Sequence, residues 1–181
     1  GLVQAVDPAG GGVTTVVELG YNTEVQSGGD VTVLEGIVRI LDESGIRAYV
    51  GPRYKSGHFY SDSGGKVAYE WYPDGGRARF EECVAFASRL RGRYTGRIAP
   101  LLAPAQVDTC TPELLRATAA AAESLDLPVQ IHAGQSAVEF RAVLGRHGRT
   151  AIEFLEDVGL LGRRLIIGHG MFLSGHRTIR H

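Results

Sequence analysis

His132 and His169 are the residues of this sequence best placed to do chemistry. Each lies near the end of a short apolar run, PVQIHAG and RLIIGHG, and each run follows a helical stretch. Parallel α/β folds carry their reactive groups at the carboxyl ends of the strands, where neighbouring strands bring such groups close together. A neutral imidazole is the commonest protein ligand for a metal ion. We therefore predict that these two histidines bind one divalent metal ion.

A structural role is the alternative for each histidine, because a lone histidine at a strand end is more often a hydrogen-bonded core residue than a ligand. Two histidines at the same end of separate strands favour metal binding instead. The apolar run at 97–104, RIAPLLAP, contains neither Lys nor Glu and so lacks the bridging group of a two-metal centre. The sequence therefore predicts a single ion, which would activate water for attack on an electrophilic carbon.

Gln135 and His176 are the two catalytic candidates beside the predicted ligands. Gln135 follows His132 by three positions, where a carboxylate would reach the activated water. A carboxamide cannot be a general acid or base, so we expect Gln135 to position the substrate. His176, in the loop after the last strand, is expected to orient substrate or carry a proton. Glu139 is the nearest carboxylate, and we expect it to be a solvated helix residue.

Strand and helix patterns alternate along the chain five times. Such alternation implies parallel strands joined by right-handed crossovers, so the fold class is α/β. The pattern alone fits either an open doubly wound sheet or a β/α barrel, and a closed barrel needs about 250 residues. Residues 53–76, which include His58, are expected to form a long polar and aromatic loop. The predicted strands are 13–20, 46–51, 97–104, 128–134 and 164–170, and the predicted helices are 31–44 with Asp30 as N-cap, 77–90, 111–126, 136–146 and 150–158.

Composition and charge narrow the class of protein. With 181 residues and 44% hydrophobic composition, the chain is expected to be one globular domain. No apolar run approaches the ~20 residues of a membrane helix, and the net charge is -1. We therefore expect a cytoplasmic protein that binds neither membranes nor nucleic acid. Cys83 and Cys110 lie outside any Cys-x-x-Cys pattern and are expected to be buried reduced thiols.

The segments GVTTVVELG and, from residue 130 to 176, QIHAGQSAVEF to RLIIGHGMFLSGH resemble the middle of an amidohydrolase superfamily enzyme. The branch they resemble holds triazine hydrolases and amino-heterocycle deaminases. Its members are β/α barrels whose single metal ion is bound by a His-x-His pair on the first strand, one His on each of the fifth and sixth, and an Asp on the eighth.

That resemblance implies that His132 is the fifth-strand ligand and His169 the sixth-strand ligand, with zinc as the expected ion and iron as the alternative. It also implies that residues 1–181 are an internal part of a (β/α)8 TIM-type barrel, an incomplete barrel without its first and last strands. Deaminases of this branch commonly carry His-x-x-Glu on the fifth strand. Gln135 replaces that Glu, which favours another base or a substrate with a better leaving group.

Three hypotheses follow for the function. The first is a metal-dependent hydrolase that acts on a C–N or similar bond of a small cyclic substrate containing nitrogen. The second is a catalytically silent binding or scaffold protein on the same fold, in which both histidines are structural. The third is an independent open α/β domain that binds a small molecule at its strand ends. Because an incomplete barrel exposes unpaired strand edges, we expect homo-oligomers rather than a compact monomer.

Overall fold

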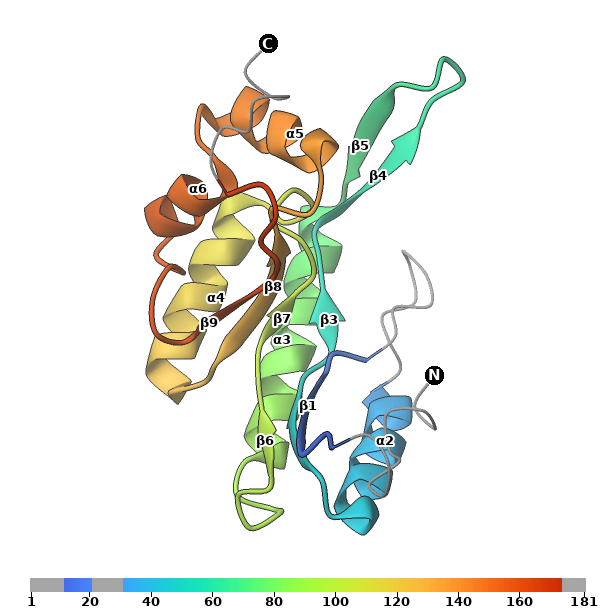
Figure 1. Ribbon diagram of the computed structural model, residues 1–181, viewed down its shortest axis with the longest axis vertical. Helices are drawn as coiled ribbons and strands as arrows, with labels where there is room; N and C mark the ends of the chain where they lie inside the picture. The colour runs from blue at the N-terminus through green and yellow to red at the C-terminus, as the bar shows by residue number, and fades with distance from the viewer. Residues whose placement is uncertain (1–11, 21–30, 174–181) are drawn as a thin grey trace.

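A computed structural model describes residues 12–20 and 31–173 of the protein. Strands and helices alternate along the chain, and an antiparallel hairpin is inserted after the second strand (Figure 1). The strands are β1 (Thr15–Glu18), β2 (Arg47–Val50), β3 (Arg53–Tyr54), β4 (Gly57–Ser61), β5 (Val67–Trp71), β6 (Ile98–Pro100), β7 (Ala103–Pro104), β8 (Val129–Ala133) and β9 (Leu165–His169). The helices are α2 (Val31–Ser44), α3 (Pro73–Leu90), α4 (Pro112–Leu125), α5 (Ala137–His147) and α6 (Ala151–Asp157).

The strands other than β4 and β5 run parallel. β2 and β3 follow each other along one strand line, and β6 and β7 along the next. β1, β2 and β6 pair in parallel in that order, β3 pairs with β7, and β8 pairs with β9. Parallel bridges from Leu102 to Val129 and from Gln106 to His132 join the β6–β7 line to β8. The described chain therefore has five parallel strand lines in sequence order, and the predicted α/β class is confirmed.

N-cap residues in the sequence determine where α4, α5 and α6 begin. Thr111 is the N-cap of α4, with Pro112 at the first helical position. Ser136 is the N-cap of α5, and its side chain accepts a hydrogen bond from the backbone of Glu139. Thr150 starts α6 with a capping box. α3 begins before the predicted residue 77, and the predicted N-cap Asp30 lies outside the described residues.

Residues 53–76 are not the loop that the sequence predicts. β3 extends the second strand line, and β4 and β5 pair as an antiparallel hairpin that projects from the body (Figure 1). The Tyr69 hydroxyl donates a 2.7 Å hydrogen bond to Asp108, and the Arg146 guanidinium lies 4.5 Å from the Tyr69 ring centroid and 5.0 Å from that of Trp71. Residues distant in sequence thus hold the hairpin, which is why its local pattern does not predict it.

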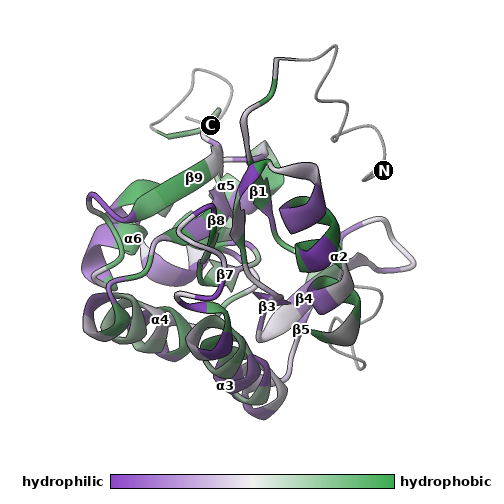
Figure 2. Ribbon diagram, turned by 90° about the horizontal axis from the view of Figure 1, so that it is seen from below, coloured by the Kyte–Doolittle hydropathy of each residue, from purple (hydrophilic) through white to green (hydrophobic). Residues whose placement is uncertain are grey.

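The core lies between the strands and an arc of helices made by α2, α3, α4 and α6 (Figure 2). On the opposite face of the strands, Val17, Tyr49 and Ile166 are exposed by 42%, 39% and 41%. Apolar side chains at strand positions are normally covered, so this face lacks a cover within residues 12–20 and 31–173. None of the helices that the structure describes has the length and hydropathy to cross a membrane.

Candidate metal centre

The two predicted ligands lie side by side at the carboxyl ends of β8 and β9. The parallel register pairs His132 with Gly168 and Ala133 with His169. Strand alternation alone would turn neighbouring side chains to opposite faces, but His169 has a φ of +73°. The centroids of the two imidazole rings are 5.0 Å apart, with 41° between the ring planes. The fold thus brings together the two histidines that the sequence predicts.

Backbone hydrogen bonds lock the two strand ends together beyond the last strand pair. The Gly170 N–H donates to the Ala133 carbonyl at 3.0 Å. The Gly134 carbonyl accepts from the N–H of Met171 at 2.9 Å and from that of Phe172 at 3.0 Å. The backbone that carries each histidine is therefore fixed by the other strand, which preorganises the pair.

Glu139 binds the backbone that follows His132 and is not the solvated helix residue that the sequence predicts. Its side chain is only 3% exposed. The carboxylate accepts hydrogen bonds from the Gly134 N–H at 2.6 Å and the Gln135 N–H at 3.0 Å. Burial raises the pKa of Glu139, although these two hydrogen bonds oppose the shift. Glu139 therefore shapes the turn that follows His132 and has a positioning role in the site.

The environment of His132 suits a neutral imidazole, which is the form that binds a metal ion. Burial lowers the pKa of His132, and the positive charge of Arg53 and the neighbouring His169 lower it further. The Nδ1 atom of His132 is buried and has no hydrogen-bond partner in the part of the chain that the structure describes. A buried nitrogen without a partner is costly in an ordinary core. The two histidines therefore fit a metal ion as ligands.

A complete coordination shell needs more than these two residues. Within residues 12–20 and 31–173, no group of three or more His, Cys, Asp or Glu side chains is arranged to bind a metal ion. His176, the second predicted catalytic residue, lies outside the described residues. His58 is close to Glu70, with 3.4 Å between Nε2 and the carboxylate, on the hairpin.

Gln135 follows the His132 strand end, and its side chain contacts Gln106, a residue that the sequence patterns did not single out. The Nε2 atom of Gln106 donates to Oε1 of Gln135 at 3.4 Å. Gln106 bridges to His132 in the parallel register, so a third strand line contributes to this end of the sheet. Arg53 was missed as well, and its buried Nε has no hydrogen-bond partner among the described residues. Each lies two residues after the end of a predicted strand, the one signal that could have identified it.

Gly168 provides the space that the His132 ring occupies. A Cβ atom at this position would lie 2.6 Å from Nδ1 of His132 and 2.9 Å from Nε2 of Gln130. We expect Gly168→Ala to displace the imidazole and to weaken metal binding by about 10- to 100-fold, as changes next to a ligand do. Metal titration followed by calorimetry measures the effect. Gly162→Ala, which has open space around its Cβ, is the control, and equal affinity in both variants would contradict the prediction.

The two predicted cysteine positions behave as expected. Cys83 and Cys110 are buried free thiols. Burial raises the pKa of each thiol to about 12, so both are protonated at neutral pH. Neither is suited to act as a nucleophile or to bind a metal ion.

Comparison with curated proteins finds deaminases. A 5-methylthioadenosine/S-adenosylhomocysteine deaminase 2 of Archaeoglobus fulgidus is 27% identical over 141 residues, which cover 78% of this chain and 31% of that protein. A 5'-deoxyadenosine deaminase of Methanothermobacter thermautotrophicus is 30% identical over 141 residues, which cover 78% of this chain and 30% of that protein. The chain therefore spans about a third of the length of these relatives.

Solved structures show the same fold. The atrazine chlorohydrolase TrzN of Arthrobacter aurescens TC1, complexed with zinc, matches with a TM-score of 0.68 and 20% identity over 87% of this chain and 34% of that one. A guanine deaminase of C. acetobutylicum matches with a TM-score of 0.63 and 20% identity over 86% and 34%. These neighbours are TIM-barrel proteins. A model of the amidohydrolase family matches residues 5–181, and the chain thus belongs to the amidohydrolase family.

Proposed function

We propose that this chain is the central part of a metal-dependent hydrolase that cleaves a C–N or similar bond of a small cyclic substrate containing nitrogen. The observation that carries the proposal is the His132 and His169 pair, with ring centroids 5.0 Å apart at adjacent strand ends. Membership of the amidohydrolase family supports it. The names of the relatives, deaminases of adenosine derivatives and a chlorohydrolase of a triazine, support the substrate class.

In this proposal residues 1–181 are one part of a (β/α)8 TIM-type barrel domain whose other strands belong to a longer protein. The chain covers 31% of one relative and 34% of one structural neighbour. The exposed side chains of Val17, Tyr49 and Ile166 line the strand face that the missing strands would close. Without those strands we expect the chain to bury this face by forming homo-oligomers.

His132 and His169 would hold one divalent ion, zinc in the first place and iron as the alternative. The remaining ligands would come from residues outside the described part of the chain. When bound, such an ion supplies Lewis acidity and an activated water nucleophile at neutral pH. Burial and the charge of Arg53 lower the pKa of His132, which favours the neutral imidazole. Glu139 fixes the turn after His132 through its two backbone hydrogen bonds.

Gln135 would position the substrate by hydrogen bonding, with its amide oriented by Gln106. A carboxamide neither takes up nor releases a proton at neutral pH, so Gln135 gives a basic leaving group no help. We therefore propose that the substrate carries a weakly basic leaving group. His176 remains the candidate for orienting the substrate or carrying a proton.

The test uses the product of the complete reading frame. We expect the purified protein to contain a stoichiometric divalent metal by elemental analysis, and to lose hydrolysis of halogenated or aminated triazines and purines when the metal is chelated. A metal-free protein without turnover would favour the alternative of a silent binding or scaffold protein. The histidines would then be structural.

The Gln135→Glu variant tests the role of the carboxamide. A carboxylate at this position can transfer protons, and such groups contribute about 100-fold or more to rate. We expect hydrolysis of amino-substituted rings to rise by about this factor relative to chloro-substituted rings. Gln135→Ala is the control for side-chain size, and it should lower both rates without changing their ratio. A wild-type protein that already prefers amino-substituted rings would contradict the proposed leaving group.

A further inference from the structure

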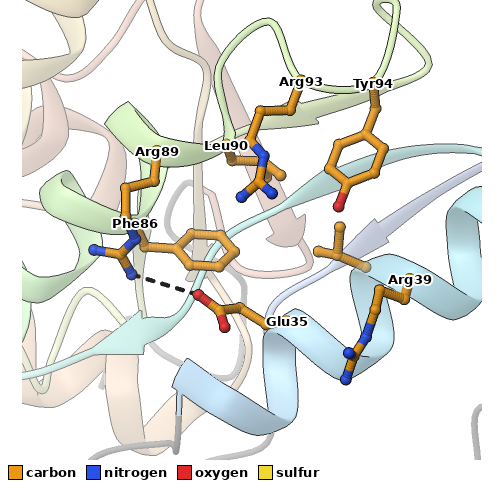
Figure 3. A pocket seen from close by; sticks show the side chains of 8 residues that line it. Glu35, Arg39, Phe86, Arg89, Leu90, Arg93 and Tyr94 are labelled. Carbon is orange, nitrogen blue, oxygen red and sulfur yellow. Dashed lines mark ion pairs between the residues drawn. The ribbon is translucent and has the colours of Figure 1, made fainter.

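A cavity away from the candidate metal centre lies on the outer layer of the molecule, between α2 and the end of α3 (Figure 3). Its volume is about 310 Å³, at the small end of the usual range for ligand sites. Its floor is made of buried apolar side chains of the core, Val38, Phe86 and Leu90. The cavity is built from different residues than the metal centre, so its ligand is independent of the proposed hydrolysis.

The walls of the cavity carry an excess of positive charge. Arg39, Arg89 and Arg93 line it together with Glu35. Glu35 lies 3.8 Å from Arg89, and this ion pair neutralises one guanidinium (Figure 3). Arg39 and Arg93 remain, and neither has an ion pair in the described part of the chain. The cavity thus has a net charge of about two positive units, which matches a phosphate monoester dianion.

Arg93 and Tyr94 present polar groups above the apolar floor. The Arg93 guanidinium and the Tyr94 hydroxyl both point into the space between the two helices (Figure 3). The Arg93 guanidinium lies 5.9 Å from the Tyr94 ring centroid. Within residues 12–20 and 31–173, neither the guanidinium nor the hydroxyl makes a hydrogen bond with another side chain. Their donors are therefore available to an oxyanion, and a guanidinium binds phosphate in a bidentate manner.

The loop that carries these two residues is held in place. The Arg93 N–H donates to the Leu90 carbonyl at 3.2 Å, and the Arg97 N–H donates to the Tyr94 carbonyl at 3.0 Å. An ion pair and hydrogen bond between Arg97 and Asp42 then tie the loop to α2. Both walls of the cavity are thus fixed relative to each other, which lowers the entropic cost of binding.

We propose that this cavity binds a small aromatic phosphate monoester. The phosphate would lie against the Arg93 guanidinium and the Tyr94 hydroxyl, and the aromatic group would lie against Phe86. The charge of the walls selects the dianion, and the apolar floor selects the aromatic part. A ligand with only one of these features would not complement the whole cavity. Inorganic phosphate would leave the apolar floor uncovered, and a neutral aromatic ring would leave the arginines without a counter-charge.

Phenyl phosphate is the probe, titrated into the product of the complete reading frame by calorimetry. We expect saturable binding that weakens as salt is added, because the contact is electrostatic. Inorganic phosphate, benzoate and phenol should each bind at least about tenfold more weakly, since each lacks the second charge or the apolar part. Equal binding of phenol and phenyl phosphate, or no saturable binding of phenyl phosphate, would overturn the proposal.

Two variants with opposite expected effects separate binding from folding. Arg93→Gln should weaken phenyl phosphate binding by about tenfold, the value of a charge-assisted contact. Glu35→Gln removes the only carboxylate among the described residues that line the cavity and frees Arg89, so it should strengthen binding several-fold. Arg116→Gln on α4 makes the same charge change as Arg93→Gln, and should leave binding unchanged. Weaker binding in Glu35→Gln, or equal weakening in Arg93→Gln and Arg116→Gln, would overturn the assignment of the cavity as an anion site.

Discussion

Replacing His169 by alanine is expected to remove the metal ion from the purified protein and to abolish hydrolysis. The change deletes one of the two proposed ligands, which the strand ends bring together. Loss of a group that only supports a ligand already costs about 10- to 100-fold in metal affinity, so loss of the ligand itself should cost more than about 100-fold. His132→Ala should have the same effect. Elemental analysis after dialysis, with the product of the complete reading frame, measures the retained metal.

His147→Ala is the matched control for this experiment. Its ring lies on α5 and stacks on Phe154, with 4.0 Å between the ring centroids, so it takes no part in the site. The control variant should keep its metal ion, although it should lose some stability from the missing ring contact. Unchanged metal content in both His169→Ala and His132→Ala would disprove the ligand assignment. The two histidines would then be structural, and the hypothesis of a silent protein would gain support.

The proximity of His132 and His169 could be predicted because its signals are local. Each histidine lies near the end of an apolar run after a helix, and the N-caps Thr111 and Thr150 mark where those preceding helices begin. Parallel order then follows from alternation, and it places both histidines at one edge of the sheet. The close contact of the rings also depends on the φ of +73° at His169, which no sequence pattern predicts.

The rest of the site depends on contacts between distant segments, and these have no local signal. Glu139 has the spacing of an exposed helix residue, yet the turn after β8 folds back over its carboxylate. The β4–β5 hairpin is held by Asp108 and Arg146, which lie far along the chain. The local pattern of its residues therefore predicts a loop. In both places, at Glu139 and in the β4–β5 hairpin, tertiary contacts set a structure that the local sequence does not favour.

Replacing Gly51 by alanine is expected to be the most destabilising small substitution in the sheet. Gly51 lies between β2 and β3, next to the segment of chain between β6 and β7. A Cβ atom here would lie 2.2 Å from the carbonyl oxygen of Leu101. That oxygen belongs to the backbone, and the Leu101 N–H is held by a 3.1 Å hydrogen bond to Val50, so it cannot turn aside. The strands must separate, which should lower the free energy of unfolding by about 3 kcal/mol.

Urea unfolding measures this cost, and Gly145→Ala supplies a control of opposite sign. Gly145 lies inside α5 with open space around its Cβ, so alanine there should raise the free energy of unfolding by about 0.5–1 kcal/mol. Both variants remove one glycine from the unfolded chain, so the difference between them isolates the contact with Leu101. A Gly51→Ala variant as stable as wild type would mean that β2–β3 and β6–β7 do not pack as closely as described.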